Sequence, residues 1–135
     1  MKIIFVIGLP ASGKTTFVCN TKHSLDLFVD DPTDINRVFE ICNKAAAENV
    51  NVYIADPKFC VCNILRSAVE ALSDKYSDAD IEFVYFDNNP QQCVVNAKNR
   101  MHAQPEKKVE NFIWQLSAQY IPNSVYEAKL IPVYS

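Results

Sequence analysis

The feature that most restricts the folds available to this chain is its low glycine content. Its 135 residues include only two glycines, Gly8 and Gly13, whereas an average composition of roughly 7% glycine predicts about nine. A dinucleotide-binding Gly-x-Gly-x-x-Gly loop needs three glycines, and a GTPase needs a further glycine after its switch aspartate. The sequence therefore excludes both classes and confines side-chain-free backbone to one short segment.

Composition and charge narrow the class further. With 49% hydrophobic and 21% charged residues, the chain is expected to form one globular domain over residues 1–135. Its net charge of −3 provides no overall field that would attract nucleic acid or an anionic membrane, so any nucleic-acid contact is expected to be local. The apolar run at residues 3–7 is too short to span a membrane or to form a signal peptide, so no membrane association is expected.

The cysteines indicate a reducing environment. The chain has five of them, an odd number with no Cys-x-x-Cys pair, and three fit the apolar stripes of the expected helices. We therefore interpret them as reduced core residues of a cytoplasmic protein. The five positions are Cys19, Cys42, Cys60, Cys62 and Cys93.

The hydrophobic pattern predicts an α/β fold. Five short β-branched or aromatic runs are apolar through their middles, as strands covered on both faces are; they lie at residues 2–7, 26–30, 50–55, 80–86 and 129–134. Segments with helical periodicity separate them, beginning after Asp31-Pro32, after Asp56-Pro57, at Asn89-Pro90 and at Pro105-Glu106. This alternation predicts a five-stranded parallel sheet with helices on both faces, and ligands at the carboxyl ends of its strands.

The segment after the first strand carries the most specific signal. Residues 8–16 match Gly-x-x-x-x-Gly-Lys-[Ser/Thr] without a mismatch, so we expect a three-layer P-loop NTPase fold that binds ATP and Mg²⁺. Successive amides of this loop and the amino end of the next helix form a site for phosphate. Lys14 is expected to contact the β and γ phosphates, and the Thr15 hydroxyl to bind Mg²⁺. The expected nucleotide-binding residues are Gly8, Ala11, Ser12, Gly13, Lys14, Thr15 and Thr16.

Acidic residues follow the second and third strands. Asp30 ends the second strand, where a carboxylate can orient a hydroxyl acceptor and take its proton, so we predict that it is catalytic. Asp31, directly before Pro32, is expected to cap the next helix. Asp56 ends the third strand and has two open interpretations: a Mg²⁺ ligand together with Thr15, or a residue that starts the following helix.

A basic cluster lies between the last two expected helices. It comprises Lys98, Arg100, His102, Lys107 and Lys108. Arg100 is the candidate catalytic residue, because a guanidinium can bind two phosphate oxygens of the transferring group. The other members are interpreted as helix-end cations, and any closure is expected to use the connection at residues 101–104, since no glycine hinge is present there.

Taken together, these motifs resemble the P-loop kinases of the polynucleotide-kinase type, best known from bacteriophage. The resemblance covers nearly the whole chain: the loop at residues 8–16, the Asp30-Asp31 pair, the strand ending at Asp56, the turn at residues 86–90 and the region 96–100. It implies transfer of the γ-phosphate of ATP to a 5′-hydroxyl. It also implies that Lys14 and Thr15 bind ATP, that Asp30 is the general base, and that Arg100 stabilises the transition state.

The acceptor remains open at this stage. No arginine flanks the acidic pair directly, and the nearest in sequence is Arg37. The alternatives are a 5′-hydroxyl nucleic acid, a small metabolite or nucleotide, and a nucleotide-binding module without catalysis.

Overall fold

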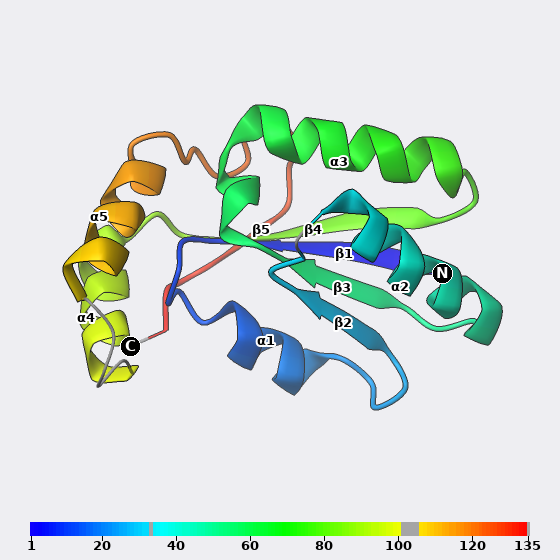
Figure 1. The fold of residues 1–135 in the computed structure, drawn as a ribbon, viewed down its shortest axis with the longest axis horizontal. Helices are drawn as coiled ribbons and strands as arrows, with labels where there is room; N and C mark the ends of the chain where they lie inside the picture. The colour runs from blue at the N-terminus through cyan, green and yellow to red at the C-terminus, as the bar shows by residue number, and fades with distance from the viewer. Residues whose placement is uncertain (33, 101–105, 135) are drawn as a thin grey trace.

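The computed structural model describes residues 1–32, 34–100 and 106–134. Five strands form one parallel sheet in the order β2-β3-β1-β4-β5 (Figure 1). The strands are β1 (Lys2–Ile7), β2 (Leu27–Asp30), β3 (Val52–Ala55), β4 (Asp80–Phe86) and β5 (Lys129–Ile131). The helices are α1 (Lys14–Thr21), α2 (Ile35–Glu48), the 3₁₀ helix η1 (Pro57–Cys60), α3 (Cys62–Lys75), α4 (Pro90–Arg100) and α5 (Glu106–Ser117).

The helices cover both faces of the sheet. Alternate residues of β1 enter two cores: Phe5 packs in the core shared with α2, α3, α4 and α5, whereas Val6 packs in the core shared with α1. In Figure 1, α2 and α3 lie above the sheet, α1 lies below it, and α4 and α5 stand beyond the carboxyl ends of the strands. This arrangement is the three-layer P-loop NTPase fold that the sequence predicts.

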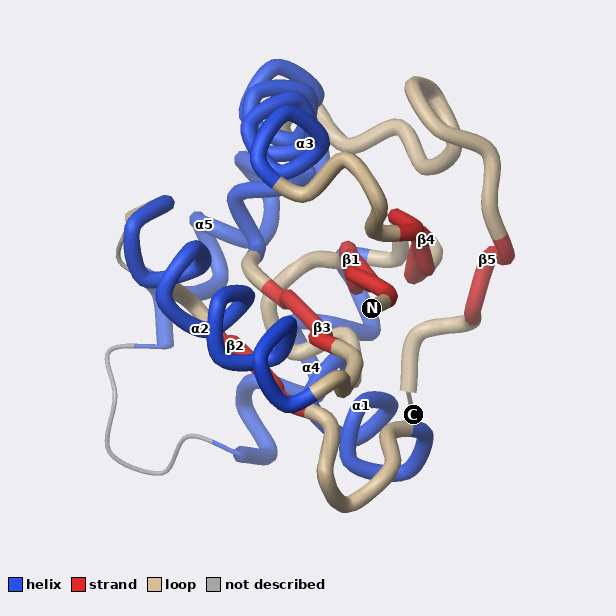
Figure 2. The backbone as a smooth tube through the Cα atoms, turned by 90° about the vertical axis from the view of Figure 1, so that its right-hand side faces the viewer, coloured by secondary structure: helices blue, strands red, loops and turns tan. Residues whose placement is uncertain are grey.

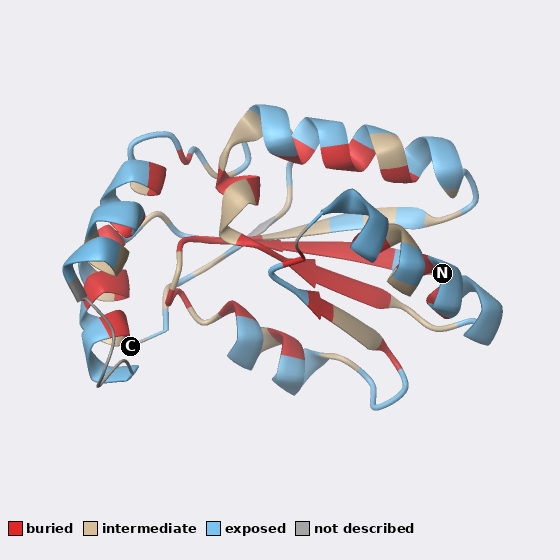
Figure 3. Cartoon of the chain, viewed as in Figure 1, coloured by how far each residue is buried: buried red, intermediate tan, exposed pale blue. Residues whose placement is uncertain are grey.

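The burial pattern explains why these segments form these elements. The central strands are buried along most of their length, and each long helix buries one stripe and exposes the other (Figure 3). Strands covered on both faces favour continuous apolar runs, which is why β1 and β3 lack alternation. Among the described residues, no helix is long and apolar enough to cross a membrane.

Three of the five cysteines are core residues, and the interpretation of all five as core residues is wrong for Cys19 and Cys62. Cys42, Cys60 and Cys93 are buried thiols, whereas Cys19 is exposed and Cys62 is half-buried. Burial raises the pKa of the Cys42 and Cys93 thiols to about 11 and that of Cys60 to about 12. These three thiols therefore remain protonated at neutral pH and act as small apolar side chains.

The structure corrects several expected boundaries. The expected second, third and fifth strands are longer than β2, β3 and β5, the last of which ends at Ile131 rather than at residue 134. The segment after Asp56 begins as the 3₁₀ helix η1, and α3 starts only at Cys62.

The capping prediction for Asp31 is wrong. Asp34 is the N-cap of α2, and its carboxylate accepts a hydrogen bond from the Arg37 amide at 3.1 Å. Asp31 instead adopts a left-handed conformation with φ 49°, which turns the chain before the helix begins. Aspartate tolerates this region better than most side chains because it is short and polar.

We expect Asp34→Ala to lower the free energy of unfolding by about 1 kcal/mol, because the substitution removes the N-cap hydrogen bond of α2. Urea denaturation followed by circular dichroism measures the change. Asp34→Asn keeps a capping oxygen and serves as the control, with a loss of a few tenths of a kcal/mol at most. Equal losses in the two variants would contradict the assignment of the cap.

Candidate nucleotide-binding site

The loop between β1 and α1 requires glycine at both of its glycine positions. Gly13 has φ 105°, in the left-handed region, and a Cβ there would lie 2.8 Å from the Cβ of Tyr134. A Cβ on Gly8 would lie 2.6 Å from the Ser12 hydroxyl and 2.9 Å from the Cβ of Phe86. The loop is therefore packed tightly against β4 and the segment after β5, as well as being able to approach a ligand closely.

Lys14 is a buried cation beneath this loop. The residue is 7% exposed, and its ammonium donates hydrogen bonds to the carbonyl oxygens of Gly8 at 3.0 Å and Leu9 at 2.9 Å. Burial lowers the pKa of Lys14, and the negative charge of the nearby Asp31 only partly opposes this effect. The two carbonyl oxygens carry only partial negative charge, so they compensate the buried ammonium incompletely. A bound polyanion would supply the full negative charge.

A polar hollow of about 190 Å³ lies over the loop and collects most of the predicted site residues. We call it the phosphate hollow; its lining comprises Pro10, Ala11, Gly13, Lys14, Thr15, Thr16, Asp30, Asp31, Pro57 and Arg100. No side chain caps α1 in the described structure, so the first amides of the helix remain available beside this hollow. Of the predicted site residues, Gly8, Ser12 and Asp56 lie outside the lining.

The acidic pair is held beside Thr15. The Thr15 hydroxyl donates a hydrogen bond to Asp30 Oδ2 at 3.3 Å. Desolvation raises the pKa of the neighbouring Asp31, and the negative charges of Asp30 and Asp56 raise it further. Carboxylates therefore concentrate at the carboxyl ends of β2 and β3, where a cation would relieve their mutual repulsion.

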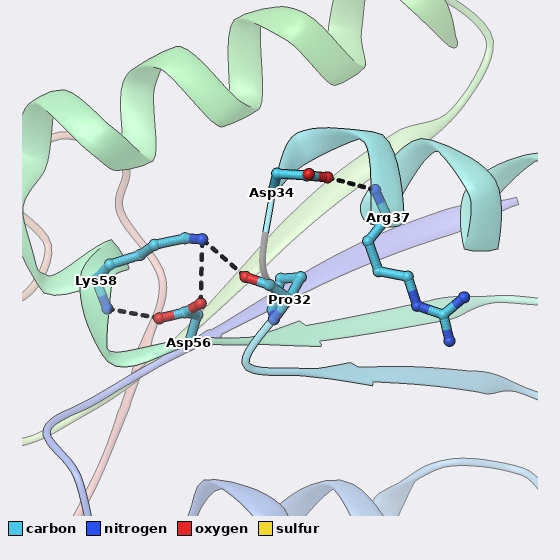
Figure 4. A network of polar contacts seen from close by, with 5 residues as sticks. All are labelled: Pro32, Asp34, Arg37, Asp56 and Lys58. Carbon is cyan, nitrogen blue, oxygen red and sulfur yellow. Dashed lines mark hydrogen bonds and ion pairs between the residues drawn. The ribbon is translucent and has the colours of Figure 1, made fainter.

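Asp56 starts a helix, which is one of the two roles that the sequence allowed: it is the N-cap of η1. The residue is 8% exposed, and its carboxylate accepts a hydrogen bond from the Lys58 amide at 2.9 Å (Figure 4). The Lys58 ammonium lies 3.3 Å from Asp56 and donates to the Pro32 carbonyl oxygen at 3.0 Å. Lys58 thus ties the loop after β3 to the loop that carries the acidic pair.

Several observations fit a Mg²⁺ ion near Thr15. Magnesium uses one or two protein oxygens and takes its other ligands from water and phosphate, so it needs no cluster of three carboxylates. The described residues hold no group of three metal-binding side chains. The hydroxyl of Thr15 and the carboxylates of Asp30 and Asp31 are hard oxygen donors that all line the phosphate hollow.

Arg100 reaches the phosphate hollow from the end of α4. Lys98, Lys107 and Lys108 are exposed and are absent from its lining. His102 and the expected connection at residues 101–104 lie outside the described residues. The structure therefore brings one member of the basic cluster to the phosphate loop.

Sequence reasoning missed the contacts that hold the loop from behind. The Asn96 side-chain amide donates to the carbonyl oxygens of Ala11, at 3.0 Å, and Tyr134, while the Tyr134 amide donates to the Ser12 carbonyl oxygen at 3.1 Å. The Asn96–Ala11, Asn96–Tyr134 and Ser12–Tyr134 pairs are 85, 38 and 122 residues apart in sequence. No local pattern could have paired them, although Asn96 lies in the region that the resemblance had already singled out.

A comparison with protein-family models found no match. The uncharacterized protein R277 of Acanthamoeba polyphaga mimivirus is 32% identical to the chain over 102 residues, which span 73% of this chain and 72% of the viral protein. The chain therefore belongs to the same family as this viral protein. Among solved structures, a gluconokinase from Sinorhizobium meliloti 1021 covers 97% of this chain and 81% of its own, with a TM-score of 0.49 and 13% identity. At this TM-score and identity, the function of the gluconokinase is not transferred to this chain.

We expect Asp31→Asn to stabilise the chain, and to do so more at about pH 7 than at about pH 4. Because the pKa of Asp31 is raised in the folded state, its ionised form costs stability once the pH exceeds the unfolded value of about 3.9. Asparagine removes this cost and tolerates the left-handed conformation. Urea denaturation of both proteins at the two pH values measures the difference, and a stabilisation that shrinks as the pH rises would contradict the electrostatic account.

Proposed function

We propose that this member of the viral protein's family is an ATP-dependent phosphotransferase, a P-loop kinase that moves the γ-phosphate of ATP to a hydroxyl acceptor. The observation that carries the proposal is the convergence of Lys14, Asp30 and Arg100 on one polar hollow. A lysine that binds phosphate, a carboxylate that accepts a proton and an arginine that stabilises the transferring group are recurring parts of sites that transfer phosphoryl groups.

Each group has a distinct role in the proposed reaction. Asp30 accepts the proton of the acceptor hydroxyl while the hydroxyl oxygen of the acceptor forms a bond to the γ-phosphorus. The bond between the γ-phosphorus and the β,γ-bridging oxygen breaks, and ADP leaves with that oxygen. Lys14 and Arg100 stabilise the negative charge on the phosphoryl oxygens, Lys14 as a point charge and Arg100 through two parallel hydrogen bonds.

Mg²⁺ would screen the charges of the β and γ phosphates when bound. Thr15 and Asp56 are the ligands that the sequence predicts. The Thr15 hydroxyl donates a hydrogen bond to Asp30, the proposed base, and Lys58 already forms an ion pair with Asp56. A contribution from Asp56 to binding the ion would therefore be through water.

The charged side chains around Asp30 and Asp31 indicate which class of acceptor the site favours. A second hollow, of about 330 Å³, is lined by Asp30, Asp31 and Arg37 together with Phe28, Val29, Pro32 and Ile41. Arg37 therefore lies beside the pair, and among the residues that the structure describes its guanidinium forms an exposed ion pair with Glu40 at 3.5 Å. A guanidinium there favours an acceptor that carries phosphate next to its hydroxyl. A 5′-hydroxyl nucleic acid is therefore the leading acceptor, and a small metabolite or nucleotide is the alternative.

Incubation with γ-labelled ATP and Mg²⁺ tests the proposal. The acceptor panel contains 5′-hydroxyl oligonucleotides, nucleosides, nucleoside monophosphates and small polyols. We expect label to transfer to one class, and Lys14→Met to abolish both transfer and ATP binding. Tight ATP binding with no transfer to any acceptor would instead indicate a nucleotide-binding module without catalysis.

Asp30→Asn should lower kcat by about 10²–10⁴-fold, because it removes the general base while keeping the size of the side chain. The dissociation constant for ATP, measured by calorimetry, should change by a few-fold at most. Asp34→Asn is the matched control and should retain full turnover, since Asp34 caps α2 outside the phosphate hollow. Unchanged turnover in Asp30→Asn would exclude Asp30 as the base.

Arg100→Ala should lower kcat by about 10²–10³-fold, because one donor to the developing charge is lost. Arg100→Lys should recover only part of this loss, since an ammonium cannot bind two oxygens in parallel. Lys98→Ala removes an exposed cation from the same helix and should have little effect. If Lys98→Ala and Arg100→Ala lowered kcat equally, the cluster would act only through its net charge.

A further inference from the structure

The phosphate hollow does not accommodate the base of a bound nucleotide. It has a volume of about 190 Å³, and no aromatic side chain is among its lining residues. Nucleotide-binding sites usually offer apolar or aromatic surface to the base and polar groups to the phosphates. If the triphosphate lies over the loop, the base must therefore lie outside this hollow, against another part of the chain.

The sheet order indicates on which side the base lies. The acidic pair follows β2, which is one edge of the sheet, and β5 forms the opposite edge, with β1 and the phosphate loop between them. In the proposed reaction the γ-phosphate faces Asp30, so the acceptor side of the loop is the β2 side. The triphosphate then crosses the loop, and the nucleoside emerges toward the segment that follows β5.

Tyr134 is the aromatic residue that this segment presents at the loop. Figure 2 shows the chain after β5 running toward the start of α1. The Tyr134 amide donates to the Ser12 carbonyl oxygen at 3.1 Å, and its own carbonyl oxygen accepts from Asn96. The Cβ of Tyr134 lies against Gly13, yet the residue is 63% exposed. The backbone of Tyr134 is thus fixed at the amino end of α1 while much of the residue faces solvent.

We infer that Tyr134 is the platform on which the base of the bound nucleoside triphosphate stacks. This inference rests on the proposed nucleotide binding. Stacking uses the π face of the base and does not read its edge, so Tyr134 would contribute affinity for purines in general and discriminate poorly between adenine and guanine. Gly13 then has a second role, because any side chain there would displace Tyr134 from the loop.

The test compares ATP with inorganic tripolyphosphate, which carries the phosphates but no base. Calorimetry of the full chain with Mg²⁺ gives both dissociation constants. We expect Tyr134→Ala to weaken ATP binding by about 10- to 100-fold and to leave tripolyphosphate binding unchanged. Tyr134→Phe keeps the ring and should retain ATP affinity, and GTP should follow ATP in every variant.

Ile121→Ala is the control for loss of an exposed apolar side chain. Ile121 is 65% exposed, lies between α5 and β5, and is absent from the lining of the phosphate hollow. We expect it to change neither constant. Equal weakening of ATP and tripolyphosphate in Tyr134→Ala would show that the residue only supports the loop, and would overturn the platform while leaving nucleotide binding intact. Failure of the parent chain to bind either ligand would overturn the proposed function and the platform together.

Discussion

The parallel pairing of β1 with β3 on one side and β4 on the other is the constraint on which the rest of the site depends. Because all five strands run in the same direction, their carboxyl ends meet at one edge of the sheet. The phosphate loop leaves from the central strand, the acidic pair leaves from β2, and Tyr134 follows β5. The loop consequently has carboxylates on one side and an aromatic residue on the other.

Electrostatic strain at this edge indicates what the site is built to receive. Lys14 is a buried cation with a lowered pKa, and Asp31 is a carboxyl group with a raised pKa, so both charged forms are disfavoured in the unliganded chain. A phosphate chain would stabilise the ammonium, and a divalent cation would stabilise the carboxylates. Mg²⁺ and a nucleoside triphosphate supply both charges together, which supports the proposed nucleotide substrate.

The loops around the site are tied to one another by single side chains. Lys58 joins the loop after β3 to the Pro32 carbonyl, directly after the acidic pair. Asn96 joins α4 to Ala11 and to Tyr134, so the helix that carries Arg100 is anchored to the phosphate loop. These ties hold together groups that come from distant parts of the chain. In phosphoryl transfer, such positioning acts together with electrostatic stabilisation to lower the barrier.

The sequence by itself determined the features that depend on local chemistry. The two glycines, Lys14 and Thr15 lie within residues 8–15, so their spacing alone located the loop between β1 and α1. The alternation of apolar runs with helical segments predicted the five strands and their parallel arrangement. Local patterns were weaker at boundaries: Asp31 and Asp34 both precede α2, and only the backbone conformation decided that Asp34 is the cap. The sequence was equally ambiguous at Asp56. Its position at the end of the third strand, directly before Pro57, fits both a Mg²⁺ ligand and the start of a helix.

Only the tertiary structure decided which distant residues reach the loop. The order β2-β3-β1-β4-β5 brings Asp30 beside Thr15 and Tyr134 beside Gly13, and the packing of α4 beyond the sheet brings Arg100 into the phosphate hollow. Local sequence patterns report the propensities of neighbouring residues and do not encode which strand lies next to which. That order is decided by burial of both faces of the sheet against all of the helices together, so the partners of the loop emerge only when the whole chain is folded.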